Sequence, residues 1–130
     1  MVARVVRMAS EGVVTALHSD SPVASPMPLH EVWAVVTRRG LYSGNQVFAP
    51  AEAVTPEQAM RMVTIDAAYT LGVEDLVGSL EPGKFADFAV LAEDPLAVPK
   101  ERIKDVAVVA TVLGGRVIPV SETKQMRAFE

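Results

Sequence analysis

The chain has 130 residues, of which 50% are apolar and 22% charged, with a formal net charge of −4. This length suffices for one domain with a hydrophobic core. The charges form no basic patch of the kind that binds nucleic acid, the lack of cysteine excludes a disulfide scaffold and thiolate chemistry, and no apolar run approaches the ~20 residues of a membrane span. No secretory signal pattern is present, so the expected location is the cytoplasm.

The first elements in the chain are expected to be a helix and a buried strand. Val2, Val5, Val6 and Ala9 recur at helical spacing, which predicts a helix over residues 1–11. Residues 13–17 are an apolar, partly β-branched run without polar alternation, as expected for a strand covered on both faces in a parallel sheet. A single strand cannot be covered in this way by the segments around it, so the first half is expected to be structurally incomplete.

Helices are also predicted after the proline-rich loop of residues 21–28. Apolar residues at i, i+3, i+4 and i+7 predict a helix over residues 29–39, with Trp33 in the core and Gly40 as its end. Residues 41–54 look irregular.

The best-marked helix covers residues 55–72. Thr55 is its expected N-cap, Pro56 takes the first helical position, Gln58 completes a capping box, and Gly72 ends the helix. Its core-facing residues are predicted to be Ala59, Met62, Val63, Ala67 and Leu71.

The remainder of the chain is predicted to be β-structure. Two short strands in residues 76–91 flank a turn in which Pro82 and Gly83 take the positions that a type II turn favours. Asp87, near Lys84, is expected to be a structural hydrogen-bonding carboxylate.

A hairpin is predicted to follow. Its strands are residues 106–113 and 116–120, joined by Gly114-Gly115, and a polar tail covers residues 121–130. Alternating α/β elements followed by strands indicate two structural layers or subdomains.

Residues 78–91, GSLEPGKFADFAVL, resemble the C-terminal β-sandwich segment of the amidohydrolase superfamily. Residues 18–23, HSDSPV, are similar to the end of the eighth barrel strand in its YtcJ-like branch, amidohydrolase family 3, where a Gly-Ser-Asp-x-Pro-Val pattern is usual. Thr37-Arg38 and residues 55–59 and 64–68 add support. The departures are His18 in place of Gly and Asp66 in place of Asn, and the resemblance covers about residues 1–118.

The resemblance implies an α/β fold that is a C-terminal fragment of a TIM-like (β/α)8 barrel plus part of a β-sandwich. Residues 1–75 would hold the last barrel strand and its helices, and residues 76–120 would be the sandwich segment. The complete enzyme would use a divalent metal, with zinc as the first candidate. It would hydrolyse a non-peptide, amide-type C–N bond of a small molecule.

Asp20 is the candidate catalytic residue. In the family, an aspartate here binds the metal or takes a proton from the attacking water, and Asp20 could act in either way as part of a complete site. The local alternative is a loop-capping aspartate before Ser21-Pro22. His18, placed by strand alternation on the same side, is a candidate substrate-binding residue or a structural histidine. His30 is expected to face solvent.

The chain has too few candidate ligands for a catalytic metal. A catalytic zinc normally has three protein ligands, but the chain contains two histidines and no His-x-His pair. We therefore expect no metal and little or no activity in the isolated chain. Two alternatives remain: a non-catalytic remnant that associates with itself, and one half of a split hydrolase. The expected partner is accordingly a second copy or a complementing chain, with no nucleic acid or membrane involved.

Overall fold

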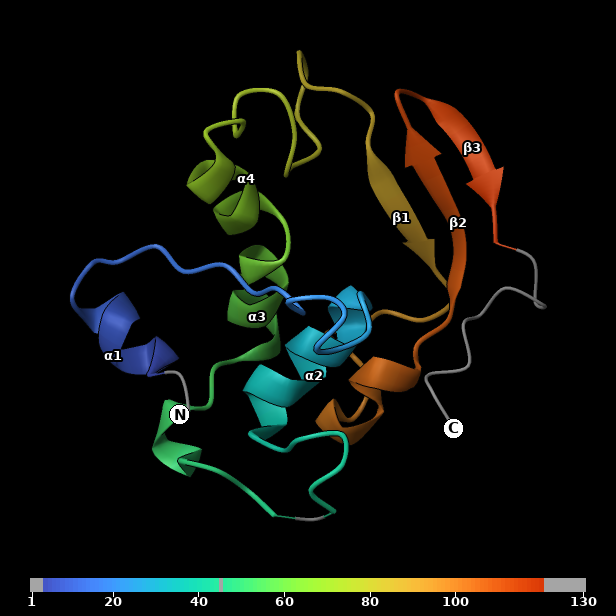
Figure 1. The fold of residues 1–130 in the computed structure, drawn as a ribbon. Helices are drawn as coiled ribbons and strands as arrows, with labels where there is room; N and C mark the ends of the chain where they lie inside the picture. Colours follow the sequence, from blue (N-terminus) through green and yellow to red (C-terminus); the bar gives the residue numbers. More distant parts are fainter. Residues whose placement is uncertain (1–3, 45, 121–130) are drawn as a thin grey trace.

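The computed structural model describes residues 4–44 and 46–120 and shows an α/β chain (Figure 1). The predicted polar tail, 121–130, lies outside the described residues. In chain order the elements are α1 (Val5–Ser10), α2 (Pro28–Thr37), the 3-10 helix η1 (Pro50–Glu52), α3 (Pro56–Met62), α4 (Ile65–Leu71), β1 (Phe88–Leu91), the 3-10 helix η2 (Lys100–Asp105), β2 (Val108–Leu113) and β3 (Arg116–Pro119). Among the described residues, no helix has the length and apolar character needed to cross a membrane.

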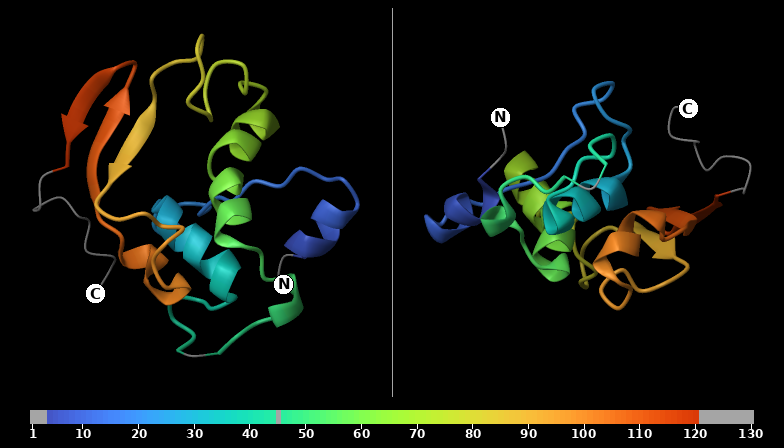
Figure 2. Two further views of the ribbon diagram at one scale, coloured as in Figure 1. Left: turned by 180° about the vertical axis from the view of Figure 1, so that it is seen from behind. Right: turned by 90° about the horizontal axis from the view of Figure 1, so that it is seen from below.

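The core is built around α2, which lies between α3 and η2 in the views of Figures 1 and 2. Val32 of α2 and Ile103 of η2 are fully buried. Trp33 is also buried, as predicted, and the Lys104 ammonium lies 5.8 Å from its ring centroid, within range of a cation–π contact. Helix η2 was not predicted, because its six residues are mostly charged and only Ile103 is buried.

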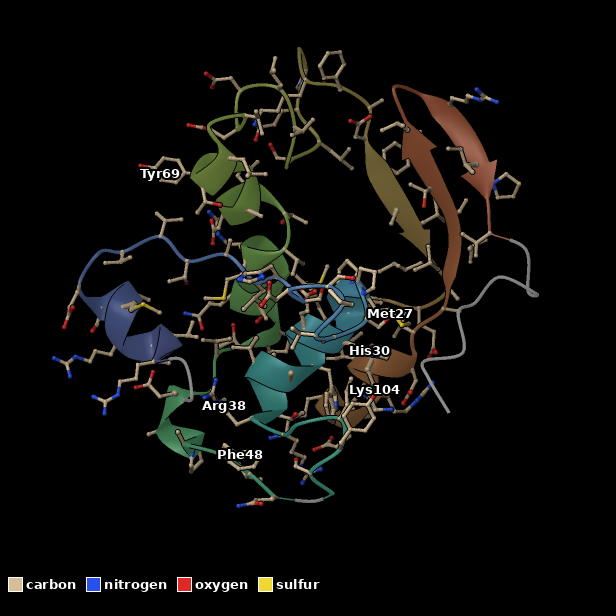
Figure 3. All side chains as sticks on the ribbon, viewed as in Figure 1. Met27, His30, Arg38, Phe48, Tyr69 and Lys104 are labelled. Atoms are coloured by element: carbon tan, nitrogen blue, oxygen red, sulfur yellow. The ribbon has the colours of Figure 1, made fainter. Side chains whose placement is uncertain are left out.

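Helix α2 ends two residues before its predicted limit. Arg38, rather than Gly40, terminates it in the left-handed region with φ +58°. The Arg38 side chain is buried, and its Nε donates a 3.1 Å hydrogen bond to the Phe48 carbonyl (Figure 3). This bond ties the end of the helix to the loop that follows and offers a physical reason for the early stop.

The predicted helix over 55–72 is in fact two helices. The capping box is present, with Gln58 N–H donating to Thr55 Oγ1 at 3.2 Å and Thr55 N–H to Gln58 Oε1 at 3.0 Å. The helix breaks at Thr64, whose hydroxyl donates to the Met60 carbonyl at 2.8 Å and whose backbone leaves the helical region. Gly72 ends α4 as predicted, but Leu71 is 76% exposed instead of facing the core.

The prediction of a buried strand at residues 13–17 was wrong. The segment is extended chain without a strand partner among the described residues, and Val13 and Val14 are 49% and 42% exposed. Its end is anchored by a hydrogen bond from Leu17 N–H to the Met62 carbonyl, 3.1 Å long. A strand needs a hydrogen-bonded neighbour, and none of the described residues supplies one.

The described residues form a three-stranded antiparallel sheet in the order β1-β2-β3. Gly114 and Gly115 both have positive φ, which confirms the predicted hairpin turn. Asp87 is structural, as predicted, because its Oδ1 accepts a hydrogen bond from Gly114 N–H at that turn.

The segment before β1 differs from its prediction. Residues 76–80 form no strand, whereas the turn after them is present, with Gly83 at φ +96° and Lys84 N–H bonded to the Glu81 carbonyl at 3.2 Å. The Pro-Gly turn therefore joins a loop to β1 and does not join two strands.

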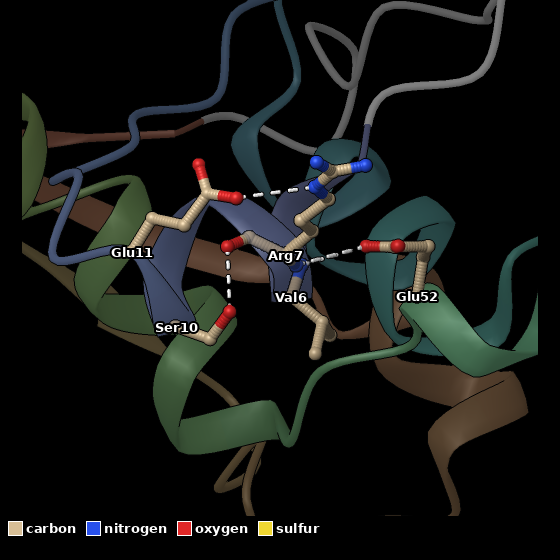
Figure 4. A network of polar contacts seen from close by, with 5 residues as sticks. All are labelled: Val6, Arg7, Ser10, Glu11 and Glu52. Carbon is tan, nitrogen blue, oxygen red and sulfur yellow. Dashed lines mark hydrogen bonds and ion pairs between the residues drawn. The ribbon is translucent and has the colours of Figure 1, made fainter.

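Helix α1 is capped by a residue far along the chain (Figure 4). Glu52 Oε2 accepts hydrogen bonds from the backbone N–H groups of Val6 at 2.9 Å and Arg7 at 3.3 Å. These amides lack partners within the helix, and a carboxylate beside them also meets the positive end of the helix dipole. Glu52 thus caps the N-terminus of α1, although it lies far from α1 in the sequence.

We expect Glu52→Ala to lower the free energy of unfolding by about 1 kcal/mol, the usual cost of losing an N-cap. Hydrogen exchange at the amides of Val6 and Arg7 should accelerate as well. Glu52→Gln keeps an acceptor oxygen and should lose less stability. Unchanged stability and exchange in Glu52→Ala would show that α1 does not depend on this contact.

Candidate functional site

The loop of residues 18–25 holds the two residues singled out by the sequence. Asp20 has φ +52°, a left-handed conformation that aspartate tolerates better than most residues. Its N–H donates to His18 Nδ1 at 3.1 Å, and its carbonyl accepts from Val23 N–H at 2.8 Å. Both bonds use the Asp20 backbone, while the residue itself is exposed.

A depression of about 410 Å³ lies between this loop, α2 and the turn at residues 41–42. His18 lines it, together with Ser25, His30 and Glu31. Asp20 is not among the lining residues. Residues 18–20 do not form a strand, so the alternation expected to place His18 and Asp20 on one side does not apply.

Burial changes the acid–base properties of two neighbouring residues on α2. It raises the pKa of Glu31, with the nearby His18 charge opposing the shift. Burial also lowers the pKa of His30; Lys104 adds to this effect and Asp105 opposes it. The lowered pKa favours the neutral form of the His30 imidazole.

The prediction that His30 faces solvent was wrong. The residue is partly buried, and its Nδ1 atom is buried with no hydrogen-bond partner in the described part of the chain. Its position off the apolar stripe of α2 suggested exposure, but it lies in the depression that the 18–25 loop and the 41–42 turn border. Only a tertiary contact of this kind could have revealed the burial, and periodicity does not detect such contacts.

The donor atoms near Asp20 do not by themselves fit a catalytic zinc. Residues 4–44 and 46–120 contain no group of three or more His, Cys, Asp or Glu side chains that could hold a metal ion. His18 Nδ1 already accepts the Asp20 N–H. A catalytic zinc needs three protein ligands, so the described residues offer at most part of such a site.

Comparison with known sequences assigns the chain to a class of enzymes. The sequence model of the amidohydrolase family matches residues 1–119, and the chain therefore belongs to this family. It is 33% identical over 108 residues to the N-substituted formamide deformylase of Arthrobacter pascens, covering 83% of this chain and 20% of the deformylase. It is 26% identical over 110 residues to the putative amidohydrolase YtcJ of Bacillus subtilis, covering 84% of this chain and 21% of YtcJ.

The fold is similar to that of a solved structure as well. An amidohydrolase from Thermotoga maritima superposes with a TM-score of 0.64 at 24% identity, covering 88% of this chain and 25% of that protein. The match of the family model confirms the family resemblance. The chain spans about a fifth of the length of the curated relatives.

Proposed function

We propose that the chain is the C-terminal part of a metal-dependent amidohydrolase that cleaves a non-peptide, amide-type C–N bond of a small molecule. The family match over residues 1–119 carries this proposal. Residues 1–75 would form the end of the barrel and residues 76–120 part of the β-sandwich. The deformylase among the relatives, named for N-substituted formamides, supports an amide-type substrate.

Asp20 is the proposed catalytic residue. An exposed carboxylate at a loop can accept a proton from water as the water oxygen attacks the carbonyl carbon. The same proton then passes to the leaving nitrogen as the C–N bond breaks, giving a carboxylic acid and an amine. His18 lines the adjacent depression and is the proposed contact to the substrate.

We propose that the complete enzyme uses a divalent metal, with zinc as the first candidate, and that this chain alone does not hold it. The family's metal dependence supports the first statement, and the incomplete donor set around Asp20 supports the second. We therefore propose that the isolated chain is inactive.

The missing partner is proposed to contact residues 13–17. Val13 and Val14 are exposed in an extended segment that has no strand partner among the described residues. A complementing chain there would make a split hydrolase, and a second copy would make a non-catalytic, self-associating remnant. Light scattering separates the two, because only the remnant forms a homo-oligomer without another chain.

The activity test uses the purified chain with zinc and a panel of small amides, with and without the polypeptide encoded immediately upstream of its gene. We expect no hydrolysis above a zinc-containing buffer for the chain alone, and turnover when a complementing chain is present. Turnover by the chain alone, lost in Asp20→Asn, would overturn the proposal of an inactive part.

A further inference from the structure

Two residues that line the depression each carry a buried polar atom that has no hydrogen-bond partner among the described residues. Ser25 Oγ and His30 Nδ1 are buried, and neither has a partner among the described residues. Both residues line the same 410 Å³ depression. Leaving a buried polar atom unpaired is costly, and such atoms in native proteins are usually paired by a ligand or an ordered water. A ligand in the depression would supply the missing partners.

The charges around the depression favour a neutral ligand. The Glu31 carboxylate lines it and disfavours anions. Arg38, which also lines it, carries a positive charge that disfavours cations. Ala34, Val35 and Leu41 add an apolar wall. The depression is therefore suited to a small molecule with an uncharged polar group and an apolar substituent.

We propose that this depression binds the secondary amide group of a small molecule through Ser25 and His30. The Ser25 hydroxyl would donate to the amide carbonyl, and His30 Nδ1 would accept from the amide N–H. Both atoms are buried, so binding would require the Ser25 hydroxyl to rotate to another staggered position and the His30 imidazole to turn about its Cβ–Cγ bond. The apolar substituent would lie against Ala34, Val35 and Leu41. This inference rests on the proposed function, whose substrate site it specifies.

The test is an NMR titration of the full chain with N-butylacetamide, a small amide with an apolar substituent. We expect saturable shifts at residues 18, 25, 30 and 31, with a Kd on the order of 1 mM for a ligand of this size. Ser25→Ala and His30→Phe should each raise this Kd by about fivefold to tenfold, because each removes one hydrogen bond to the ligand. Ser10→Ala, which removes a hydroxyl on α1 outside the depression, should leave the Kd unchanged.

N-butyl-N-methylacetamide lacks the amide N–H, so the wild-type chain should bind it less tightly than N-butylacetamide. In His30→Phe the two amides should bind with similar affinity, because the acceptor of that N–H is already absent. The effects of methylation and of the His30 change on the Kd should therefore not be additive. Absence of shifts at the depression, or a Kd that either folded variant leaves unchanged, would overturn the inference. Ser25→Ala removes one oxygen only, so a failure of His30→Phe to fold leaves the test intact. If the depression binds N-butylacetamide but no complemented enzyme hydrolyses an amide, the result counts against the proposed function. If a complemented enzyme hydrolyses amides but the depression does not bind N-butylacetamide, the result counts against this site.

Discussion

We expect the replacement of Asp20 with asparagine to lower kcat of the proposed complemented enzyme by about 10²–10⁴-fold, the usual contribution of a positioned acid–base group. The amide of asparagine has similar shape but cannot take a proton from the attacking water. The hydrogen bonds described for Asp20 are made by its backbone N–H and carbonyl, so the loop geometry should survive the change. The measurement is the steady-state rate of amide hydrolysis, with circular dichroism to confirm folding.

Asp75→Asn is the matched control for this prediction. Asp75 is also an exposed aspartate in a non-helical segment, but it lies after α4, away from the 18–25 loop. Its replacement should leave kcat unchanged. If a folded Asp20→Asn enzyme has the wild-type kcat, Asp20 takes no part in the hydrolysis. Asp20 would then be a loop-capping residue.

The largest expected loss of stability comes from Gly78→Ala, at the start of the segment that indicated the family. Gly78 has φ +94°, and an added Cβ would lie 2.7 Å from Ala68 Cβ and 3.0 Å from Ile65 Cα. The left-handed backbone costs a non-glycine residue about 1–2 kcal/mol, and overpacking costs about 1–3 kcal/mol. We expect chemical denaturation to show a total loss of about 2–5 kcal/mol.

Gly83→Ala separates these two contributions. Gly83 has a similar φ of +96°, but an added Cβ would meet no atom within 4 Å. Its replacement should cost only the backbone strain of about 1–2 kcal/mol. Equal losses at the two positions would show that the close approach of Gly78 to α4 contributes nothing to stability.

Local turn and cap chemistry could be predicted from the sequence because its partners are adjacent in the chain. The capping box of Thr55 and Gln58, the end of α4 at Gly72 and the Gly114-Gly115 hairpin turn are all present. Each depends on residues within a few positions of one another, and each uses a backbone geometry that few residue types adopt.

The errors share a different physical origin. Residues 13–17 have strand composition, but strand formation requires a neighbouring strand that the described residues do not include. The cap of α1 is Glu52, which is 46 positions from Val6, and no local pattern could indicate it. His30 is buried by the tertiary arrangement around α2 rather than by its own periodicity.

The candidate site could be predicted only in part. His18 and Asp20 were selected by resemblance to a family motif, and their roles remain predictions. Ser25 and His30 carried no sequence signal, because an unpaired buried atom is recognised only in three dimensions. The depression that brings them together with Glu31 is formed by a loop, a helix and a turn that are separate in the chain.

The most direct test of the central claim is the zinc content of the purified chain, measured by elemental analysis for wild type and Asp20→Ala. A part of a metal site that lacks three convergent ligands should not retain a structural or catalytic ion. We predict no stoichiometric zinc in either protein after dialysis. Stoichiometric zinc in the wild-type chain that is lost in Asp20→Ala would contradict the account, because it would show a complete metal site within this chain.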